Sequence, residues 1–68
     1  MDYQKLGELT DRALRNACAV SVTFYDDGTS YVALASHGVE YVSKTHSNAI
    51  TLELFEEKLD AIEGGRGL

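Results

Sequence analysis

The chain contains little that would support a disulfide-linked or membrane-spanning protein. Among its 68 residues Cys18 is the one cysteine, so no disulfide can form within the chain, and we interpret it as a small core residue rather than a nucleophile. No apolar run is long enough to cross a membrane, and we expect no signal peptide. These features predict a soluble protein of a reducing cytoplasm.

Motifs of catalysis and metal binding are also missing. His37 and His46 do not fall with Cys18 at the spacing of a metal site, so we expect no metal and no cofactor. No residue lies in a nucleophile motif, and the glycine-rich segment 64–67 follows a helix instead of opening one, unlike a phosphate loop. A chain of this size buries only about 60% of its unfolded surface, which leaves little room for an enclosed active site. We therefore predict that the protein is not an enzyme.

Positive charge is scarce and negative charge is concentrated in one segment. The chain has 6 lysines and arginines against 11 carboxylates, giving a net charge of −5. Residues 51–63 hold five of those carboxylates and only one cation, Lys58. Nucleic acids and anionic membranes would repel such a chain, so we expect neither as a direct partner. A basic protein surface is the partner that this charge favours.

Two helices are predicted to flank a region of strands. Residues 1–17 carry apolar side chains at helical spacing, although Thr10 could instead cap a shorter helix. The second helix is predicted to begin at Thr51, whose hydroxyl can cap it, and to end at Gly64.

The first hairpin is predicted in one of two registers. Residues 19–25 and 30–35 read as strands joined by a glycine-ended loop at 26–28. A two-residue loop would place apolar side chains on the polar face of the partner strand. A three-residue loop pairs Val22 with Val32 and keeps the apolar side chains on one face, so we favour it.

The register of the third strand, residues 39–45, stays open. Either Val42, or Tyr41 together with Val39, faces the core. If the second loop copies the first, Tyr31 and Tyr41 lie side by side on the outer face of the sheet.

The predicted fold is α+β: helix, three-stranded antiparallel meander, helix (αβββα), with both helices on one sheet face. Residues 1–68 form a single domain, with a flexible tail at 64–68. The same order of elements occurs in the double-stranded RNA-binding domain, which needs a basic first turn on its last helix. This chain has Glu53, Glu56 and Glu57 there, so we reject that function.

The carboxylates of the last helix fall on one side of it. They span about 120° beside the buried stripe, and neighbours lie about 5–6 Å apart, on the scale of adjacent phosphates along a nucleic-acid strand. The plain alternative is a solvated helix face that keeps the protein soluble. Asp26, Asp27 and Glu40 could extend the negative surface. We call the following five residues the acidic arc: Glu53, Glu56, Glu57, Asp60 and Glu63.

The strand at 38–43, the polar loop with Asn48 and the acidic segment 54–57 resemble small acidic phage-encoded anti-CRISPR proteins of the DNA-mimic type. The resemblance implies a monomeric, non-enzymatic inhibitor in the host cytoplasm, which blocks binding of target DNA and its protospacer-adjacent motif by a CRISPR effector complex. The acidic arc would occupy a basic DNA site on that complex, with Asp26 and Asp27 next. The cations of the first helix depart from the most acidic mimics.

An interaction module of another kind is the alternative function. A small phage or bacterial protein, antitoxin-like or active in host takeover, would bind a partner through the outer sheet face. Tyr31 and Tyr41 would be its anchors, with Tyr25 nearby, because tyrosine is favoured at the centres of interfaces.

Overall fold

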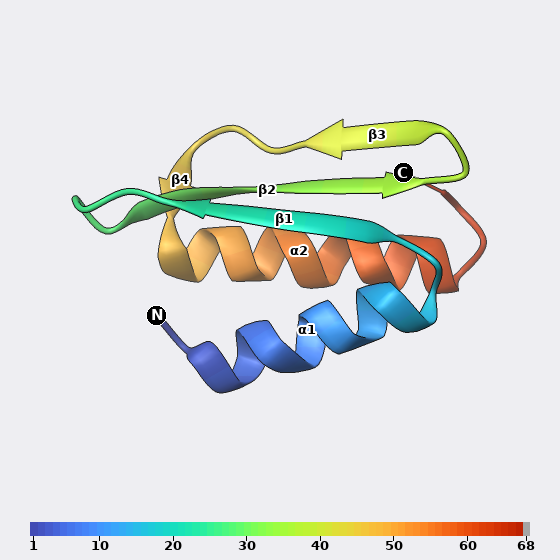
Figure 1. Ribbon diagram of the computed structural model, residues 1–68, viewed down its shortest axis with the longest axis horizontal. Coiled ribbons are helices and arrows are strands. Elements are labelled where there is room, and N and C mark those ends of the chain that lie inside the picture. Colours follow the sequence, from blue (N-terminus) through green and yellow to red (C-terminus); the bar gives the residue numbers. More distant parts are fainter. Residues whose placement is uncertain (68) are drawn as a thin grey trace.

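A computed structural model describes residues 1–67 and confirms the predicted α+β fold, with one short strand added (Figure 1). The strands form one antiparallel sheet in the order β1-β2-β3, and β4 pairs with the start of β2. The elements in chain order are α1 (Tyr3–Arg15), β1 (Ala19–Phe24), β2 (Thr29–Ser36), β3 (Val39–Val42), β4 (His46–Ser47) and α2 (Asn48–Glu63).

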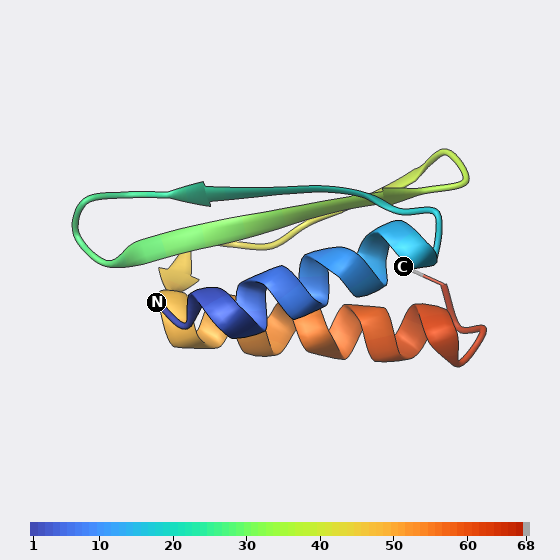
Figure 2. The same ribbon diagram turned by 60° about the horizontal axis from the view of Figure 1, so that its bottom comes forward.

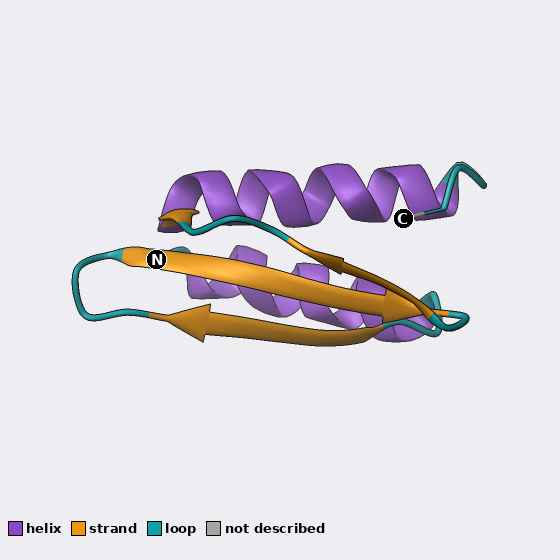
Figure 3. Ribbon diagram, turned by 90° about the horizontal axis from the view of Figure 1, so that it is seen from above, coloured by secondary structure: helices purple, strands orange, loops and turns teal. Residues whose placement is uncertain are grey.

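Both helices cover the same face of the sheet, as predicted (Figures 1 and 2). Helix α1 packs on β1, α2 packs on β2 and β4, and the two helices contact each other. Viewed from above, the other face of the sheet is covered by no further element of the described residues (Figure 3). No helix in the described part of the chain is long and apolar enough to span a membrane.

The core lies between the sheet and the two helices. Phe55, Val32 and Leu34 are fully buried, and Cys18 is 3% exposed, in agreement with its predicted place in the core. Burial of these side chains is the main favourable contribution to folding. The remaining buried apolar residues are Leu9, Ala13, Leu52 and Leu59.

The first hairpin has the predicted three-residue register, with Val22 opposite Val32. Gly28 has φ +84°, the left-handed conformation that the loop requires. The Asp27 carboxylate accepts hydrogen bonds from the backbone N–H and the hydroxyl of Thr29. These bonds lower the pKa of Asp27 and give the side chain a structural role in the turn.

The second hairpin does not copy the first. His37 and Gly38 form a two-residue turn in which both have positive φ, 51° and 79°. Leu34 therefore pairs with Tyr41, whose ring lies on the helix side of the sheet. The predicted side-by-side placement of Tyr31 and Tyr41 on the outer face is wrong, because the two turns differ in length by one residue and a one-residue slip reverses every side chain.

The third strand is shorter than predicted and ends at Val42. Ser43 is buried, and its hydroxyl oxygen accepts the N–H of Val32 at 3.0 Å. The N–H of Ser43 donates to the carbonyl oxygen of Val32 at 2.9 Å. The serine side chain thus replaces part of the backbone pairing at the point after β3 where the chain moves away from β2, before it pairs with β2 again as β4.

Helix α2 begins three residues earlier than predicted. Ser47 stands at its N-cap without a side-chain bond, and the N–H of Asn48 donates to the Gly28 carbonyl oxygen at 3.2 Å. Thr51 is fully buried, and its hydroxyl donates to the Ser30 carbonyl oxygen at 3.0 Å, so the predicted cap at Thr51 is wrong. Pairing of the preceding residues as β4 fixes the chain and lets the helix start at once.

Helix α1 starts near the beginning of the chain, as in the longer of the two predictions, but it covers Tyr3–Arg15 instead of residues 1–17. Asp2 caps it by accepting the N–H of Lys5 at 3.0 Å, so the shorter helix starting at Thr10 is wrong. At the other end of the chain, residues 64–67 are exposed and follow α2 without forming another element. The predicted tail includes residue 68, which lies outside the described residues, and its flexibility stays a prediction.

Candidate interaction surfaces

The acidic arc faces α1 along much of its length. Arg12 of α1 places Nη2 2.9 Å from Oδ1 of Asp60 and 2.6 Å from Oε1 of Glu63. Lys5, two helical turns earlier, lies 3.8 Å from Glu56 through Nζ and Oε1. Three of the five predicted site residues on this helix therefore meet cations of the same chain.

The contact around Arg12 is also a hydrogen-bond network. Nδ2 of Asn16 donates to Oε2 of Glu63 at 3.0 Å, and the Arg12 side chain is only 26% exposed. Hydrogen bonds from Arg12 and Asn16 lower the pKa of Glu63, while Glu63 and Asp60 raise the pKa of Arg12. The network joins the C-terminal ends of the two helices and compensates charge that the sequence suggested was free.

Two carboxylates of the acidic arc remain open to solvent. Glu53 and Glu57 are exposed, and neither forms an ion pair within residues 1–67. Lys58, the one cation in this part of α2, lies over the ring of Tyr41 at 4.5 Å from its centroid. The freely available negative surface of α2 is therefore smaller than the sequence predicted.

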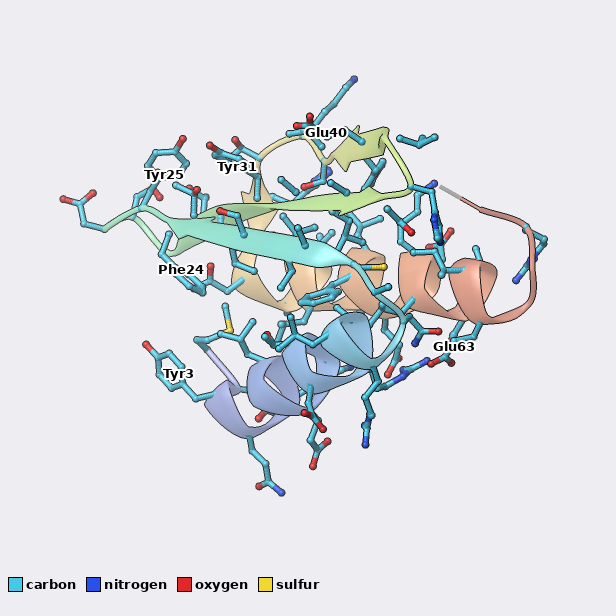
Figure 4. The ribbon with its side chains drawn as sticks, turned by 45° about the vertical axis from the view of Figure 1, so that its right-hand side comes forward. Tyr3, Phe24, Tyr25, Tyr31, Glu40 and Glu63 are labelled. Carbon is cyan, nitrogen blue, oxygen red and sulfur yellow. The ribbon has the colours of Figure 1, made fainter. Side chains whose placement is uncertain are left out.

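The other predicted acids do not extend the arc. Glu40 pairs with Ala35 in the sheet and points to the face away from the helices (Figure 4). Asp26 and Asp27 lie in the β1–β2 loop, which projects past the start of α2 (Figure 1). The structure thus separates the predicted acidic residues into three places.

The uncovered face of the sheet forms a second candidate surface. Tyr25 and Tyr31 lie on it with ring centroids 6.3 Å apart, and Figure 4 shows both rings on the side away from the helices. Val42 is 53% exposed on the same face, opposite Ala33. We call the following residues the outer face: Ser21, Thr23, Tyr25, Tyr31, Ala33, Ala35, Glu40 and Val42.

Sequence reasoning placed Tyr31 correctly on the outer face but missed Val42. The alternation of the third strand gave two readings, and Val42 was the residue that one of them buried. The signal that would have decided is the dipeptide His37-Gly38, because a residue pair that tolerates positive φ suits a two-residue hairpin turn.

The surface of the described residues also has shallow hollows, of which two lie close to these candidate surfaces. The larger, of about 400 Å³, is bordered by the second hairpin and the end of α2, with Val39 and Ile62 in its wall. The smaller, of about 290 Å³, lies at the start of α2 beside Lys5 and Glu53. Within residues 1–67, no group of three or more His, Cys, Asp or Glu side chains comes together as a metal site would require.

Known proteins offer no guide to the choice between these surfaces. The chain matches no model of a protein family, no curated protein and no solved structure.

Proposed function

We propose that the protein is a non-enzymatic interaction module that binds another protein through its outer face. One observation carries the proposal: an uncovered sheet face presents two adjacent tyrosines and a half-exposed valine. Tyrosine offers a large apolar ring with a polar end and loses little conformational entropy when it is bound, which suits it to the centre of an interface.

The charge around the outer face points to the chemistry of the partner. Glu40 is its only charged residue, and Asp26 lies in the loop that follows Tyr25. The small side chains of Ala33 and Ala35 leave the middle of the face flat. The partner therefore presents an apolar centre, with lysine or arginine placed to meet Glu40. We place the encounter in the cytoplasm, where the single buried thiol would stay reduced.

The second candidate is an anti-CRISPR-like inhibitor that imitates DNA. Glu53 and Glu57 favour it, because both are exposed on one helix of a chain with net charge −5. The rest of the arc supports it less, since Glu56, Asp60 and Glu63 would have to exchange Lys5 and Arg12 for the cations of an effector. Such an exchange yields less binding free energy than pairing a free carboxylate.

One capture experiment separates the two candidates. Immobilised protein is incubated with a lysate of the source cells, or of the host cells if the chain is phage-encoded, and the captured partner is compared among three versions. These are the wild type, Tyr31→Ala with Val42→Lys, and Glu53→Lys with Glu57→Lys. Loss of capture only in the outer-face variant supports the interaction module, whereas loss only in the helix variant supports DNA mimicry.

Salt and competing DNA add an independent measurement. Binding that depends on the acidic arc should weaken as salt rises, because salt screens the charges of the two proteins. DNA should also compete with it, because DNA occupies the basic site of the partner. Binding through the outer face changes little with either. Circular dichroism of each variant confirms that the fold is retained, which is expected since all four altered side chains lie on the surface or half-exposed.

A further inference from the structure

Strand β1 has a free edge without the features that usually protect one. It pairs with β2 over six consecutive residues without a bulge, and among residues 1–67 no element lies beside its other edge (Figure 3). Its sequence, AVSVTF, contains no charged residue and no proline. Exposed edges of this kind are normally blocked by lysine, proline or a bulge, since they can pair with another strand.

The backbone groups that face this free edge belong to three residues. Tyr25 donates its N–H to the carbonyl oxygen of Thr29, so the odd-numbered residues of β1 make the bonds to β2. The N–H and C=O groups of Val20, Val22 and Phe24 therefore point outward. Phe24, whose side chain lies on the helix side, is also 43% exposed (Figure 4).

Helix α1 carries an uncharged stripe on the same flank of the molecule. Tyr3, Gly7, Thr10 and Leu14 recur at spacings of four, three and four residues, which places them on one side of the helix. Tyr3 is 73% exposed and Leu14 is 62% exposed. The hydroxyl of Thr10 is already used, since it donates to the Leu6 carbonyl oxygen at 2.8 Å.

The stripe lies on the side of α1 turned away from α2. At 100° per residue, its centre is about 180° from the side that carries Lys5 and Arg12, which contact α2. Because α1 packs under β1 and α2 packs under β2, the side turned away from α2 lies below the free edge of β1. Edge and stripe thus form one continuous flank.

We propose that this flank binds the same flank of a second copy, giving a two-fold symmetric dimer. Strand β1 pairs antiparallel with its counterpart, with Val22 opposite Val22 and Val20 opposite Phe24. All outward N–H and C=O groups of the three residues are then satisfied. The two sheets become one continuous sheet, with four helices on one face, and the exposed Phe24 ring packs beside Val20 of the other copy.

The two-fold axis that pairs the β1 strands also brings the uncharged stripes of the two α1 helices into contact. Val22 lies three residues, or about 10 Å, along β1 from its start near the end of α1. A length of 10 Å corresponds to about seven residues of helix, which reaches the midpoint between Gly7 and Thr10. Tyr3 therefore meets Leu14 of the second copy, while Gly7 meets Thr10 and lets the helices approach closely. Two independent patterns share one axis, which is why we assign a second copy rather than an unrelated peptide.

Charge favours this flank for self-association. Each copy carries −5, so contact has to occur where acids are few. Neither β1 nor the stripe has a charged residue, and at the rim Asp11 is paired with Arg15 at 3.2 Å. Because the remaining charges repel at longer range, the dimer should strengthen as salt rises. The outer face stays open in the dimer, so this inference stands apart from the proposed function.

Sedimentation equilibrium from micromolar to millimolar concentration tests the dimer. The wild type should approach twice the chain mass of 7.4 kDa. Gly7→Arg should remain at 7.4 kDa, because the new side chain fills the contact between helices. Apart from the two chain neighbours of Gly7 and the backbone of its own helix, no atom lies within 4 Å of the position that a Cβ would take there. Arginine is also a better helix former than glycine, so the substitution should leave the fold intact, and circular dichroism checks this.

A matched control adds the same side chain to α1 outside the stripe. Gln4→Arg should behave as the wild type, while Leu14→Arg should behave as Gly7→Arg. A wild type that stays at 7.4 kDa at every concentration overturns the proposal. A dimer that persists in both stripe variants overturns it too, because it would place the interface elsewhere.

Cross-linking tests the register. In the proposed pairing Ser21 lies opposite Thr23 of the other copy, at a non-hydrogen-bonded position where paired cysteines fit a disulfide. The double variant Ser21→Cys with Thr23→Cys should therefore form a covalent dimer on mild oxidation. Neither single variant should do so, since each position meets a different residue in the second copy, and the native Cys18 is buried. Equal cross-linking of the single and double variants contradicts the register.

Discussion

Arg12 and Glu63 are joined at 2.6 Å across the gap between the two helices, although 51 residues separate them in the chain. The contact holds the C-terminal end of α1 against the C-terminal end of α2. It also changes the meaning of the acidic arc, because the carboxylates nearest to α1 help to assemble the fold.

The first prediction concerns Arg12→Ala. The change removes two ion pairs and leaves Asp60 and Glu63 facing each other without a cation. We expect a loss of about 1 kcal/mol in the free energy of unfolding, at the upper end for a partly exposed pair. Urea unfolding followed by circular dichroism measures it. Arg15→Ala is the control, since Arg15 is 68% exposed and its one ion pair within residues 1–67 is with Asp11 of the same helix. A loss as large there would contradict the role of Arg12.

The second prediction is a dependence of stability on acid pH. Hydrogen bonds from Arg12 and Asn16 lower the pKa of Glu63 in the folded chain below its ordinary value, which is about 4.3 in an unfolded one. The contribution is therefore complete above pH 4.3 and is lost as pH falls through the folded pKa. Unfolding curves between pH 7 and pH 3 should show a smaller loss for Glu63→Gln than for the wild type. Equal slopes for the two would contradict this.

The first hairpin could be predicted from the sequence because its two strands bury one face each. For one face of the hairpin to be apolar, Val20 and Val22 have to lie opposite Leu34 and Val32, and of the two loop lengths only the three-residue loop gives this pairing. The third strand carries large side chains on both faces, with Val42 53% exposed and Tyr41 half-buried, so alternation alone gave no register. Turn geometry decided it.

The compensation of the acidic arc was harder to foresee. The positions of charged side chains around the axis of one helix can be predicted from the sequence, since successive residues are 100° apart. Which cations of another helix reach them depends on how the helices pack. A signal was nevertheless present: Lys5 and Arg12 are seven residues apart, two turns of one helix, and match the spacing of Glu56 and Glu63 on the other.

The third prediction is that the turn at His37 can be improved. His37 has φ 51° and precedes a glycine with φ 79°, which is the backbone of a turn that prefers asparagine followed by glycine. His37→Asn should raise the free energy of unfolding by about 0.5 kcal/mol. Gly38→Ala should lower it by about 1 kcal/mol, because alanine is strained at positive φ. Thermal unfolding of both variants checks the pair, and effects of the same sign would contradict the two-residue turn.

The fourth prediction contrasts two buried hydroxyls at the junction of β2 and α2. Thr51 donates to the carbonyl oxygen of Ser30 at 3.0 Å, and both residues are fully buried. The hydroxyl oxygen of Ser30 itself has no hydrogen-bond partner within residues 1–67. Removing a bonded group leaves its partner less satisfied, whereas removing an unbonded polar group relieves a desolvation cost.

Thr51→Val should therefore lower the free energy of unfolding by about 1–2 kcal/mol, while Ser30→Ala should leave it unchanged or raise it. Urea unfolding of the two single variants measures the contrast. The double variant measures how strongly the two effects are coupled, because Thr51 bonds to the Ser30 backbone and residues in contact are commonly non-additive. A large loss from Ser30→Ala alone would show that its hydroxyl is satisfied in solution and that the junction is more polar than the contacts of Thr51 imply.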